Sequence, residues 1–284
     1  MKILLTGGAG YIGSHVLLSA LEKNHEVIII DDLSTGNINL IPGNAKLIRC
    51  NINDRETISN LLNAEKFDLL LHFAGFIKVE ESVSNPNKYF KNNTYNAISL
   101  FENCYDNNLS NVIFSSTAAA YGNPVNKNSI TESTHLNPLN PYGESKVKTE
   151  KYLLENKDKF NSIILRYFNV AGADPKLRSG LISDEPTHLI KILSEVATGK
   201  RSKMAVYGND YNTPDGTAIR DYIHVSDLAD IHLKAADYLL EQGIAGVLYV
   251  KATVKEAKVV FTITKRINKK PKKKQIIPEL VTST

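Results

Sequence analysis

The sequence predicts an α/β fold with a doubly wound parallel sheet and a smaller C-terminal α/β lobe. Three observations support this class. Short apolar runs alternate with longer amphipathic segments over the first two-thirds of the 284 residues, as in βαβ units. A glycine-rich turn directly follows the first apolar run. After Tyr167, glycine and proline punctuate the chain more often, which favours a less regular lobe closing over the sheet.

We expect six strands and four helices in the alternating region. The strands are short and rich in apolar residues, and the segments between them are amphipathic. Asp54 is expected to cap the second helix, because its carboxylate can accept hydrogen bonds from the unpaired N–H groups of the first turn. The expected strands span 2–6, 26–30, 46–50, 68–73, 111–115 and 162–167, and the expected helices span 11–23, 54–64, 86–107 and 142–155.

The net charge of +4 is unevenly distributed, with −4 over residues 1–250 and +8 over residues 251–284. A nucleic-acid partner would need basic residues spread over a folded face, so none is expected. No apolar run approaches the roughly 18 residues that span a bilayer, and the N-terminal run is too short for a signal peptide. We therefore expect a cytoplasmic protein without a membrane partner, with Cys50 and Cys104 as reduced thiols.

The glycine-rich turn carries Gly7, Gly10 and Gly13 at intervals of three. Glycines are needed where a backbone must approach a pyrophosphate closely and a helix must pack tightly on the preceding strand. The next helix would direct its free N–H groups and the positive end of its dipole toward the phosphates. The turn therefore predicts a Rossmann-type dinucleotide site, although a tight βα turn without a ligand can have the same glycines.

The second expected strand ends at Asp31 and Asp32, about 20 residues beyond the glycines. An acidic side chain at this place can hydrogen-bond the ribose hydroxyls of the adenosine, and it repels a 2′-phosphate. The pair therefore favours NAD over NADP as the cofactor. A turn or capping role for Asp31 is the alternative.

Tyr142 and Lys146 lie four residues apart, so they share one face of the expected helix. A phenol is a poor base near neutral pH, but a neighbouring cation stabilises the phenolate and lowers the pKa. Thr117 lies just beyond the fifth expected strand, at the sheet edge where open α/β folds bind ligands. We therefore expect Thr117, Tyr142 and Lys146 to be catalytic, with Tyr142 as general acid and base and Lys146 lowering its pKa.

The chain resembles the UDP-glucose 4-epimerases of the extended short-chain dehydrogenase/reductase family, from Met1 to about Tyr249. The blocks that follow the catalytic helix are more specific than the glycine turn. The resemblance rests on residues 6–15, 72–75, 81–82, 114–117, 141–143, 165–169, 207–211 and 220–225. No metal is expected, because the seven histidines lack metal-ligand spacing.

The resemblance implies NAD-dependent interconversion of UDP-glucose and UDP-galactose through a 4-keto intermediate, in a homodimer packed through residues 86–107 and 142–155. It also implies two sets of binding residues. The cofactor set is Gly7, Gly10, Tyr11, Ile12, Gly13, Asp31, Asp32, Asn51, Ile52, Phe73, Ala74, Gly75, Asn92, Thr117, Tyr142, Lys146 and Phe168. The UDP-hexose set is Thr117, Tyr142, Asn169, His188, Leu189, Ala205, Val206, Tyr207 and Arg220.

By this resemblance, residues 1–168 form an NAD-binding domain, residues 169–250 an incomplete UDP-sugar lobe, and residues 251–284 an atypical basic tail. The Asn and Gly-x-Gly turn usual after Tyr249 is replaced by Val250-Lys251-Ala252-Thr253. A shifted reading frame or a truncated gene would explain this change, and a naturally evolved basic tail is the alternative. DNA downstream that restores the missing motif in another frame would support the first explanation. We expect such a chain to bind NAD and to epimerise weakly or not at all.

Two other functions stay open. A non-catalytic NAD-binding remnant of an epimerase would keep the glycine turn and lose turnover. A nucleotide-sugar dehydratase would share the fold and the Tyr-Lys pair, but it needs carboxylates beside the threonine, and Thr117 is followed by three alanines. Hydride transfer to bound cofactor on addition of UDP-hexose, seen by absorbance, distinguishes the epimerase from the remnant.

Overall fold

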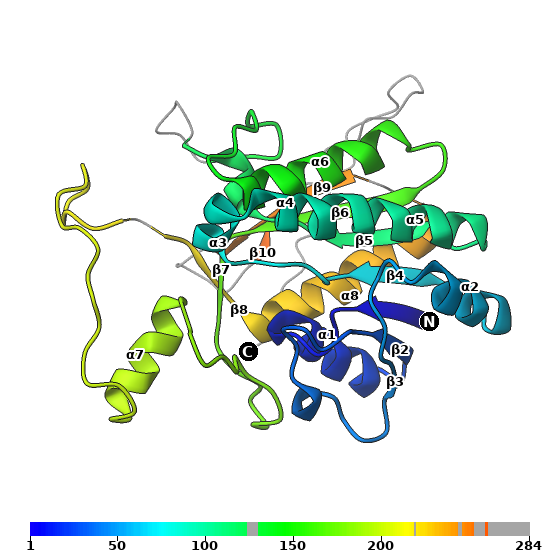
Figure 1. Ribbon diagram of the computed structural model, residues 1–284, viewed down its shortest axis with the longest axis horizontal. Helices are drawn as coiled ribbons and strands as arrows, with labels where there is room; N and C mark the ends of the chain where they lie inside the picture. Colours follow the sequence, from blue (N-terminus) through cyan, green and yellow to red (C-terminus); the bar gives the residue numbers. More distant parts are fainter. Residues whose placement is uncertain (124–129, 219, 244–245, 253–258, 261–284) are drawn as a thin grey trace.

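The computed structural model describes residues 1–123, 130–218, 220–243, 246–252 and 259–260. Within these ranges, the main sheet has eight strands in the order β10-β9-β6-β5-β4-β1-β2-β3 (Figure 1). Seven strands are parallel, and β10 pairs antiparallel with β9. The strands are β1 (Lys2–Thr6), β2 (Glu26–Ile30), β3 (Lys46–Ile48), β4 (Leu69–His72), β5 (Asn111–Ser115), β6 (Asn161–Tyr167), β9 (Gly246–Ala252) and β10 (Val259–Val260).

Helices cover both faces of this sheet (Figure 1). Because successive strand residues point to opposite faces, Ile3 and Leu5 of β1 enter one core and Leu4 enters the other. The first core is closed by α1 (Tyr11–Glu22) and α8 (Val225–Gln242), and the second by α2 (Arg55–Ala64), α5 (Ala97–Asp106) and α6 (Pro141–Glu155). The six expected strands and the doubly wound parallel fold are confirmed.

The expected helix over residues 86–107 is interrupted by a π-helical segment, Phe90–Asn96, between α4 (Pro86–Tyr89) and α5. Single π-helical turns often accompany functional sites. Two buried side chains of this segment form hydrogen bonds with residues outside it. Asn93 bonds both the N–H and the carbonyl of Phe76, and Thr94 Oγ1 donates to the Ser145 carbonyl at 2.8 Å. A short helix, α3 (Val79–Ser84), precedes α4. The π-helical segment Phe90–Asn96 is therefore connected by hydrogen bonds to α6 and to the loop after β4.

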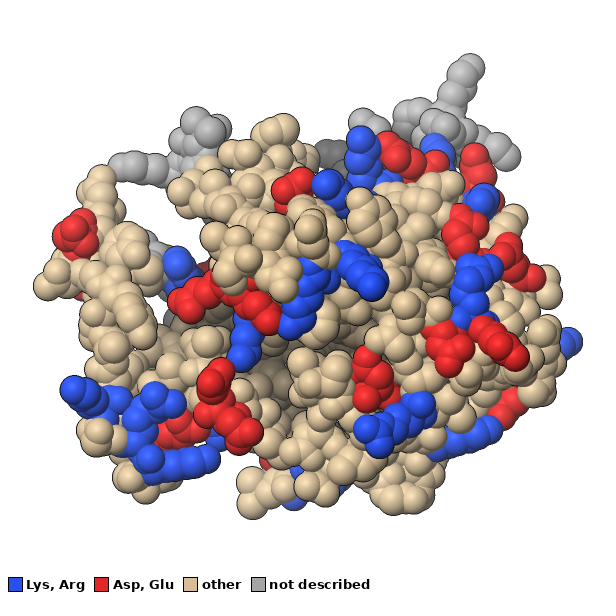
Figure 2. Space-filling model, in the orientation of Figure 1, with Lys and Arg blue, Asp and Glu red and all other residues tan. Residues whose placement is uncertain are grey.

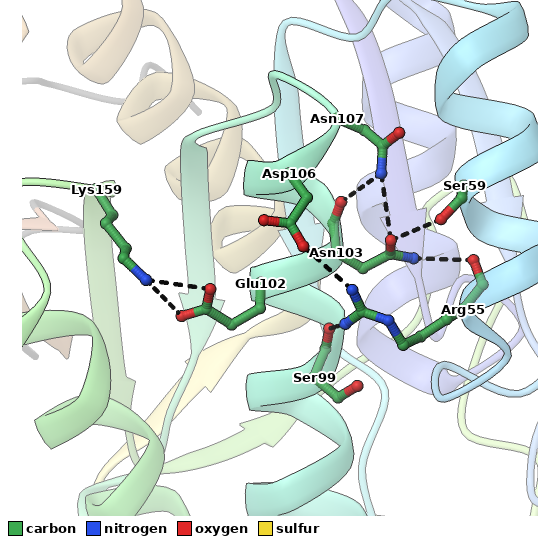
Figure 3. Close-up of polar contacts among 8 residues, drawn as sticks. All are labelled: Arg55, Ser59, Ser99, Glu102, Asn103, Asp106, Asn107 and Lys159. Atoms are coloured by element: carbon green, nitrogen blue, oxygen red, sulfur yellow. Dashed lines mark hydrogen bonds and ion pairs between the residues drawn. The ribbon is translucent and has the colours of Figure 1, made fainter.

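Side-chain hydrogen bonds and an ion pair join α2 to α5 (Figure 3). Buried Asn103 donates to the Arg55 carbonyl at 3.1 Å and accepts from Ser59 at 2.7 Å. Arg55 Nη2 also lies 3.1 Å from a carboxylate oxygen of Asp106. Asp54 caps α2 by accepting from Thr57 N at 3.1 Å, as the sequence predicts. These contacts fix both helices over the sheet.

The region after β6 contains a two-stranded parallel sheet, β7 (Asn169–Ala171) with β8 (Tyr222–His224), and the separate helix α7 (Leu189–Ala197) (Figure 1). The sequence assigns helix α8 and strand β9 to the second lobe. In the structure, α8 packs on α1 and β9 pairs with β6. A boundary at residue 169 therefore does not follow the sheet, because the chain returns to it after β8. The atypical tail, apart from the backbone of 251–252 and 259–260, lies outside the described residues.

Short 3₁₀ turns occur at Ile38–Leu40 and Ala118–Tyr121. No helix within the described ranges is long and apolar enough to cross a membrane. On the face drawn in Figure 2, Lys and Arg side chains are interspersed with Asp and Glu side chains.

Candidate active site

The glycine turn packs directly against the loop that follows β4. Gly7 has a positive φ of 75°, and a Cβ added there would lie 2.6 Å from Ala74 N. A Cβ added to Gly13 would lie 2.2 Å from the Gly7 carbonyl oxygen. No side chain caps the first turn of α1, whose N-cap is Gly10. The turn is therefore a tight cradle, and the first N–H groups of α1, which no side chain caps, are available to a bound pyrophosphate.

A pocket opens at the carboxyl ends of β1, β2 and β4, where the strand order changes direction. Ten residues of the expected cofactor set line it: Gly7, Gly10, Asp31, Asp32, Asn51, Ile52, Phe73, Ala74, Gly75 and Asn92. Tyr11, Ile12 and Gly13 lie alongside in the first turn of α1, and Phe168 packs near the 3₁₀ turn after β5. The fold thus gathers lining residues from five separate stretches of sequence at one pocket.

Six lining residues were not expected: Ile30, Ser34, Thr35, Gly36, Cys50 and Phe76. Three of them form the turn after Asp31 and Asp32, and a Cβ on Gly36 would lie 2.7 Å from that of Ala9. The Ser-Thr-Gly turn beside the acidic pair is the sequence signal that could have identified them.

Asp31 and Asp32 have different surroundings. Asp31 is 9% exposed and accepts from the N–H groups of Ala9 and Leu33, both at 2.9 Å. Burial raises its pKa, and these two bonds oppose the rise. Asp32 accepts from Ser34 N at 2.9 Å and from Asn51 Nδ2 at 2.6 Å. Asp31 therefore supports the glycine turn, and Asp32 connects β2 to the residues after β3.

Lys146 is 3% exposed and extends from α6 toward the cofactor pocket. Its Nζ donates to the Ser115 carbonyl at 3.0 Å and lies 4.9 Å from the centre of the Phe114 ring. A Cβ added to Gly75, a pocket residue, would lie 3.4 Å from the same Nζ. The ammonium group is therefore next to the pocket wall.

Tyr142 is half-buried at the start of α6. Burial raises the pKa of Tyr142 above its ordinary value, and the side chain of Thr117 opposes this rise. That Lys146 lowers this pKa stays a prediction. In the structure described, the Lys146 ammonium group donates to the Ser115 carbonyl, while burial removes hydration from the phenol.

The residues expected to bind the UDP-hexose lie in the region after β6. Asn169 N donates to the Asp221 carbonyl at 3.3 Å, which brings Asn169 next to the Arg220 backbone. His188 is the N-cap of α7, and burial lowers its pKa. Ala205, Val206 and Tyr207 are exposed, and Leu189 is 42% exposed. Among the described residues that line the cofactor pocket, none comes from this group, so its role stays a prediction.

A family model described as the NAD dependent epimerase/dehydratase family matches residues 3–247. The chain belongs to this family. Within it, a UDP-glucose 4-epimerase of Azospirillum brasilense is 46% identical over 244 residues, which cover 85% of this chain and 70% of that protein.

Two solved structures of the epimerase group are also similar. A UDP-glucose 4-epimerase from Brucella ovis in complex with NAD has a TM-score of 0.84 and 37% identity, covering 88% of this chain and 77% of that one. A UDP-glucose-4-epimerase from Stenotrophomonas maltophila with bound NAD and formylated UDP-arabinopyranose has a TM-score of 0.85 and 32% identity, covering 89% and 78%.

The site of this epimerase/dehydratase family member fits NAD. The cradle at Gly7 and Gly13 has no room for a Cβ, so its backbone can approach a pyrophosphate. The carboxylates of Asp31 and Asp32 line the same pocket, where ribose hydroxyls can bind and a further phosphate would be repelled. Lys146 lies beside Gly75, another lining residue of this pocket.

Lys146 is expected to make the stability of this epimerase/dehydratase family member depend on pH. Burial lowers its pKa from 10.5 to about 8. Between these two pH values the unfolded chain binds more protons than the folded chain, so the free energy of unfolding rises with pH. Below pH 8 the folded chain bears the full unfavourable free energy of the buried ammonium group. Relative to Lys146→Met, the wild-type chain should gain on the order of 3 kcal/mol of unfolding free energy between pH 7 and pH 10.5. Urea denaturation of both chains measures this, and a difference independent of pH would contradict it.

Proposed function

We propose that the protein is an NAD-dependent UDP-glucose 4-epimerase that interconverts UDP-glucose and UDP-galactose by reversible oxidation at C4. One observation carries the proposal: Lys146 Nζ, bonded to the Ser115 carbonyl at 3.0 Å, lies beside Gly75 of the cofactor pocket. Tyr142 lies one turn earlier on the same helix, which supports a role for it as general acid and base next to the dinucleotide site.

The relatives support this reaction in particular. The Azospirillum brasilense protein is named UDP-glucose 4-epimerase, and the Brucella ovis structure holds NAD. The Stenotrophomonas maltophila structure holds both NAD and a UDP-sugar. The dehydratase alternative lacks support, because Ala118 and Ala119 follow Thr117 where elimination of water would need carboxylates.

In the proposed reaction, Tyr142 takes the proton from the sugar 4-hydroxyl and later returns it. Bound NAD supplies reversible acceptance of a hydride. Thr117 donates a hydrogen bond to the phenol oxygen and so stabilises the phenolate. Lys146 adds a buried positive charge one helical turn away, beside the end of the pocket. Burial of these groups strengthens their electrostatic interactions and excludes water from the reacting atoms.

We assign the UDP end of the substrate to the region after β6. Arg220 suits a diphosphate, because a guanidinium group donates to two oxygens at once. Support comes from the bond of Asn169 N to the Asp221 carbonyl, which joins Arg220 and Asn169 at the start of the β7–β8 sheet. His188, Leu189, Ala205, Val206 and Tyr207 would contribute the rest of the site.

Turnover of UDP-galactose by the full chain tests the function. UDP-glucose should form without added reductant, and adding UDP-hexose to the NAD-loaded protein should produce absorbance near the reduced-nicotinamide band. Binding of NAD with neither signal would favour the non-catalytic remnant. Formation of a dehydrated 4-keto-6-deoxy sugar would favour a dehydratase.

We also propose a homodimer packed through residues 86–107 and 142–155. Large apolar side chains are exposed on these segments: Tyr95 is 64% exposed, Leu154 is 44% and Tyr105 is 39%. Sedimentation velocity should show a dimer that Tyr95→Glu converts to monomers. Ile38→Glu, which changes a 51% exposed side chain outside these helices, should leave the dimer intact. A wild-type monomer at micromolar concentration would contradict the proposal.

A cytoplasmic location is part of the same proposal. Cys50 and Cys104 are free thiols, which suit a reducing compartment. Fractionation of the producing cell tests this, and recovery of the protein outside the cytoplasm would refute it.

A further inference from the structure

Glu150 lies on the same face of α6 as Tyr142 and Lys146, one turn beyond the lysine. The three residues are spaced four apart, so their side chains lie in a row along the helix. Lys146 is 3% exposed and Glu150 is 1% exposed. An ionised carboxylate at such a depth requires partners, and these connect it to the rest of the site.

Arg166 of β6 and Ser116 hold the Glu150 carboxylate. Arg166 Nε donates to both carboxylate oxygens at 3.0 Å, and Nη2 lies 2.5 Å from Oε2. Ser116 Oγ donates to Oε1. The remaining side of Arg166 is held by Tyr121, whose hydroxyl accepts from Nη1 at 3.1 Å. The Glu150 carboxylate is therefore fixed by hydrogen bonds from two other elements.

Ser116 lies between the two residues that hold the catalytic pair. The carbonyl of the preceding residue, Ser115, accepts from Lys146 Nζ at 3.0 Å, and the side chain of the following residue, Thr117, lowers the pKa of the Tyr142 phenol. Ser116 N also donates to the Leu165 carbonyl at 2.9 Å, which secures this backbone to β6. A displacement of Ser116 would therefore move the partners of Lys146 and Tyr142 together.

A buried ion pair can also serve only to join α6 to β6. Buried pairs are weak indicators of stability, because apolar side chains of similar volume often replace them at no cost. The two interpretations differ in what they predict for Lys146. If the ion pair is only structural, its replacement leaves the pKa of Lys146 unchanged. If Glu150 positions and supports Lys146, its replacement changes that pKa.

We propose that Glu150 is a positioning residue of the active site, which holds the backbone of Ser115–Thr117 through Ser116 and supplies the negative charge that keeps Lys146 protonated. Arg166 holds the Glu150 carboxylate in place. The kinetic part of this inference rests on the proposed epimerase function, and the electrostatic part does not. Consistent with the geometry, the negative charge of Glu150 raises the pKa of Lys146 against the effect of burial.

Other titratable groups also face Lys146 and Glu150. Burial and the nearby Lys146 hold the pKa of His72 at about 3, so the imidazole is neutral and adds no charge. Tyr142 of α6, Tyr121 of the 3₁₀ turn, and Arg166 and Tyr167 of β6 also lie around Lys146 and Glu150, and Glu132 lies near Tyr121 and Arg166. Arg166 contacts Glu150 directly. Glu150 is the carboxylate that acts on Lys146.

Three variants of the full chain separate the two contributions of Glu150. Glu150→Gln keeps the size and an acceptor for Ser116 but removes the charge. Ser116→Ala removes the hydrogen bond but leaves the charge. The double variant Glu150→Leu with Arg166→Met removes both charges without leaving a buried unpaired ion, so it stays informative if Glu150→Gln does not fold. Ser162→Ala, at the opposite end of β6 and 4% exposed, is the matched control.

Two measurements are made on each folded variant. The titration of Lys146 is followed by NMR of ¹³Cε-labelled lysine without nucleotide, assigned with Lys146→Met. Steady-state kinetics with UDP-galactose give kcat and KM separately. Because the titration needs no turnover, it tests the inference even if the epimerase function fails.

We expect Lys146 to titrate about one pH unit lower in Glu150→Gln, and lower by a smaller amount in the double variant. Ser116→Ala should leave the titration unchanged. All three should lower kcat on the order of 10-fold, with little change in KM, because the partners of the acid and base shift while the substrate contacts stay. Ser162→Ala should match the wild type. A Lys146 titration unchanged in every folded charge variant, or a wild-type kcat in the double variant, would overturn the proposal.

Discussion

Tyr142→Phe is expected to lower kcat for UDP-galactose by about 10²–10⁴-fold while NAD remains bound. The change removes the one hydroxyl that Thr117 contacts and leaves the ring, which packs edge-to-face against Tyr89 with centroids 6.4 Å apart. The fold should therefore be unaffected. The measurements are steady-state kinetics with UDP-galactose and the NAD content of the purified protein.

Tyr152→Phe is the matched control for this loss. Tyr152 is on the same helix, and its buried hydroxyl has no hydrogen-bond partner among the described residues. Removal of that hydroxyl should leave kcat near the wild-type value. A comparable loss of kcat in both variants would show that removal of any tyrosine hydroxyl from α6 impairs turnover. A fully active Tyr142→Phe protein would exclude Tyr142 as the general acid and base.

Gly13→Ala is expected to lower the affinity for NAD at least about 100-fold, which corresponds to roughly 2.7 kcal/mol. The added Cβ would lie 2.2 Å from the Gly7 carbonyl oxygen, so the cradle must open and the N–H groups of α1 must shift from the pyrophosphate position. Overpacking of this kind should also lower the free energy of unfolding by about 1–3 kcal/mol. Calorimetric titration with NAD and urea denaturation measure the two effects.

Gly43→Ala provides the control, since a Cβ at Gly43 meets nothing within 4 Å. Its unfolding free energy should stay within about 0.5 kcal/mol of the wild type, with unchanged affinity for NAD. If Gly13→Ala binds NAD as tightly as Gly43→Ala does, the glycine turn is not the phosphate site.

Local sequence patterns predicted the elements of the sheet closely. Strands β1, β2 and β5 have the expected bounds, because each is a short apolar run that is buried on both faces. Helix α6 begins one residue earlier than expected, at Pro141, a residue favoured at the first helical position. The π-helical segment at Phe90–Asn96 was not predicted, because contacts of Asn93 and Thr94 with distant residues determine it.

The amino-acid sequence by itself determined the family, the glycine cradle, the acidic pair and the Tyr142–Lys146 spacing, since each is a local pattern with a local physical cause. Only the tertiary structure decided how these parts act on one another. It directed Lys146 to the Ser115 carbonyl, buried the Tyr142 phenol so that its pKa rises, and returned α8 and β9 to the main sheet. Burial and the partner of each charged group depend on which distant segments pack together, and spacing along the chain does not contain that information.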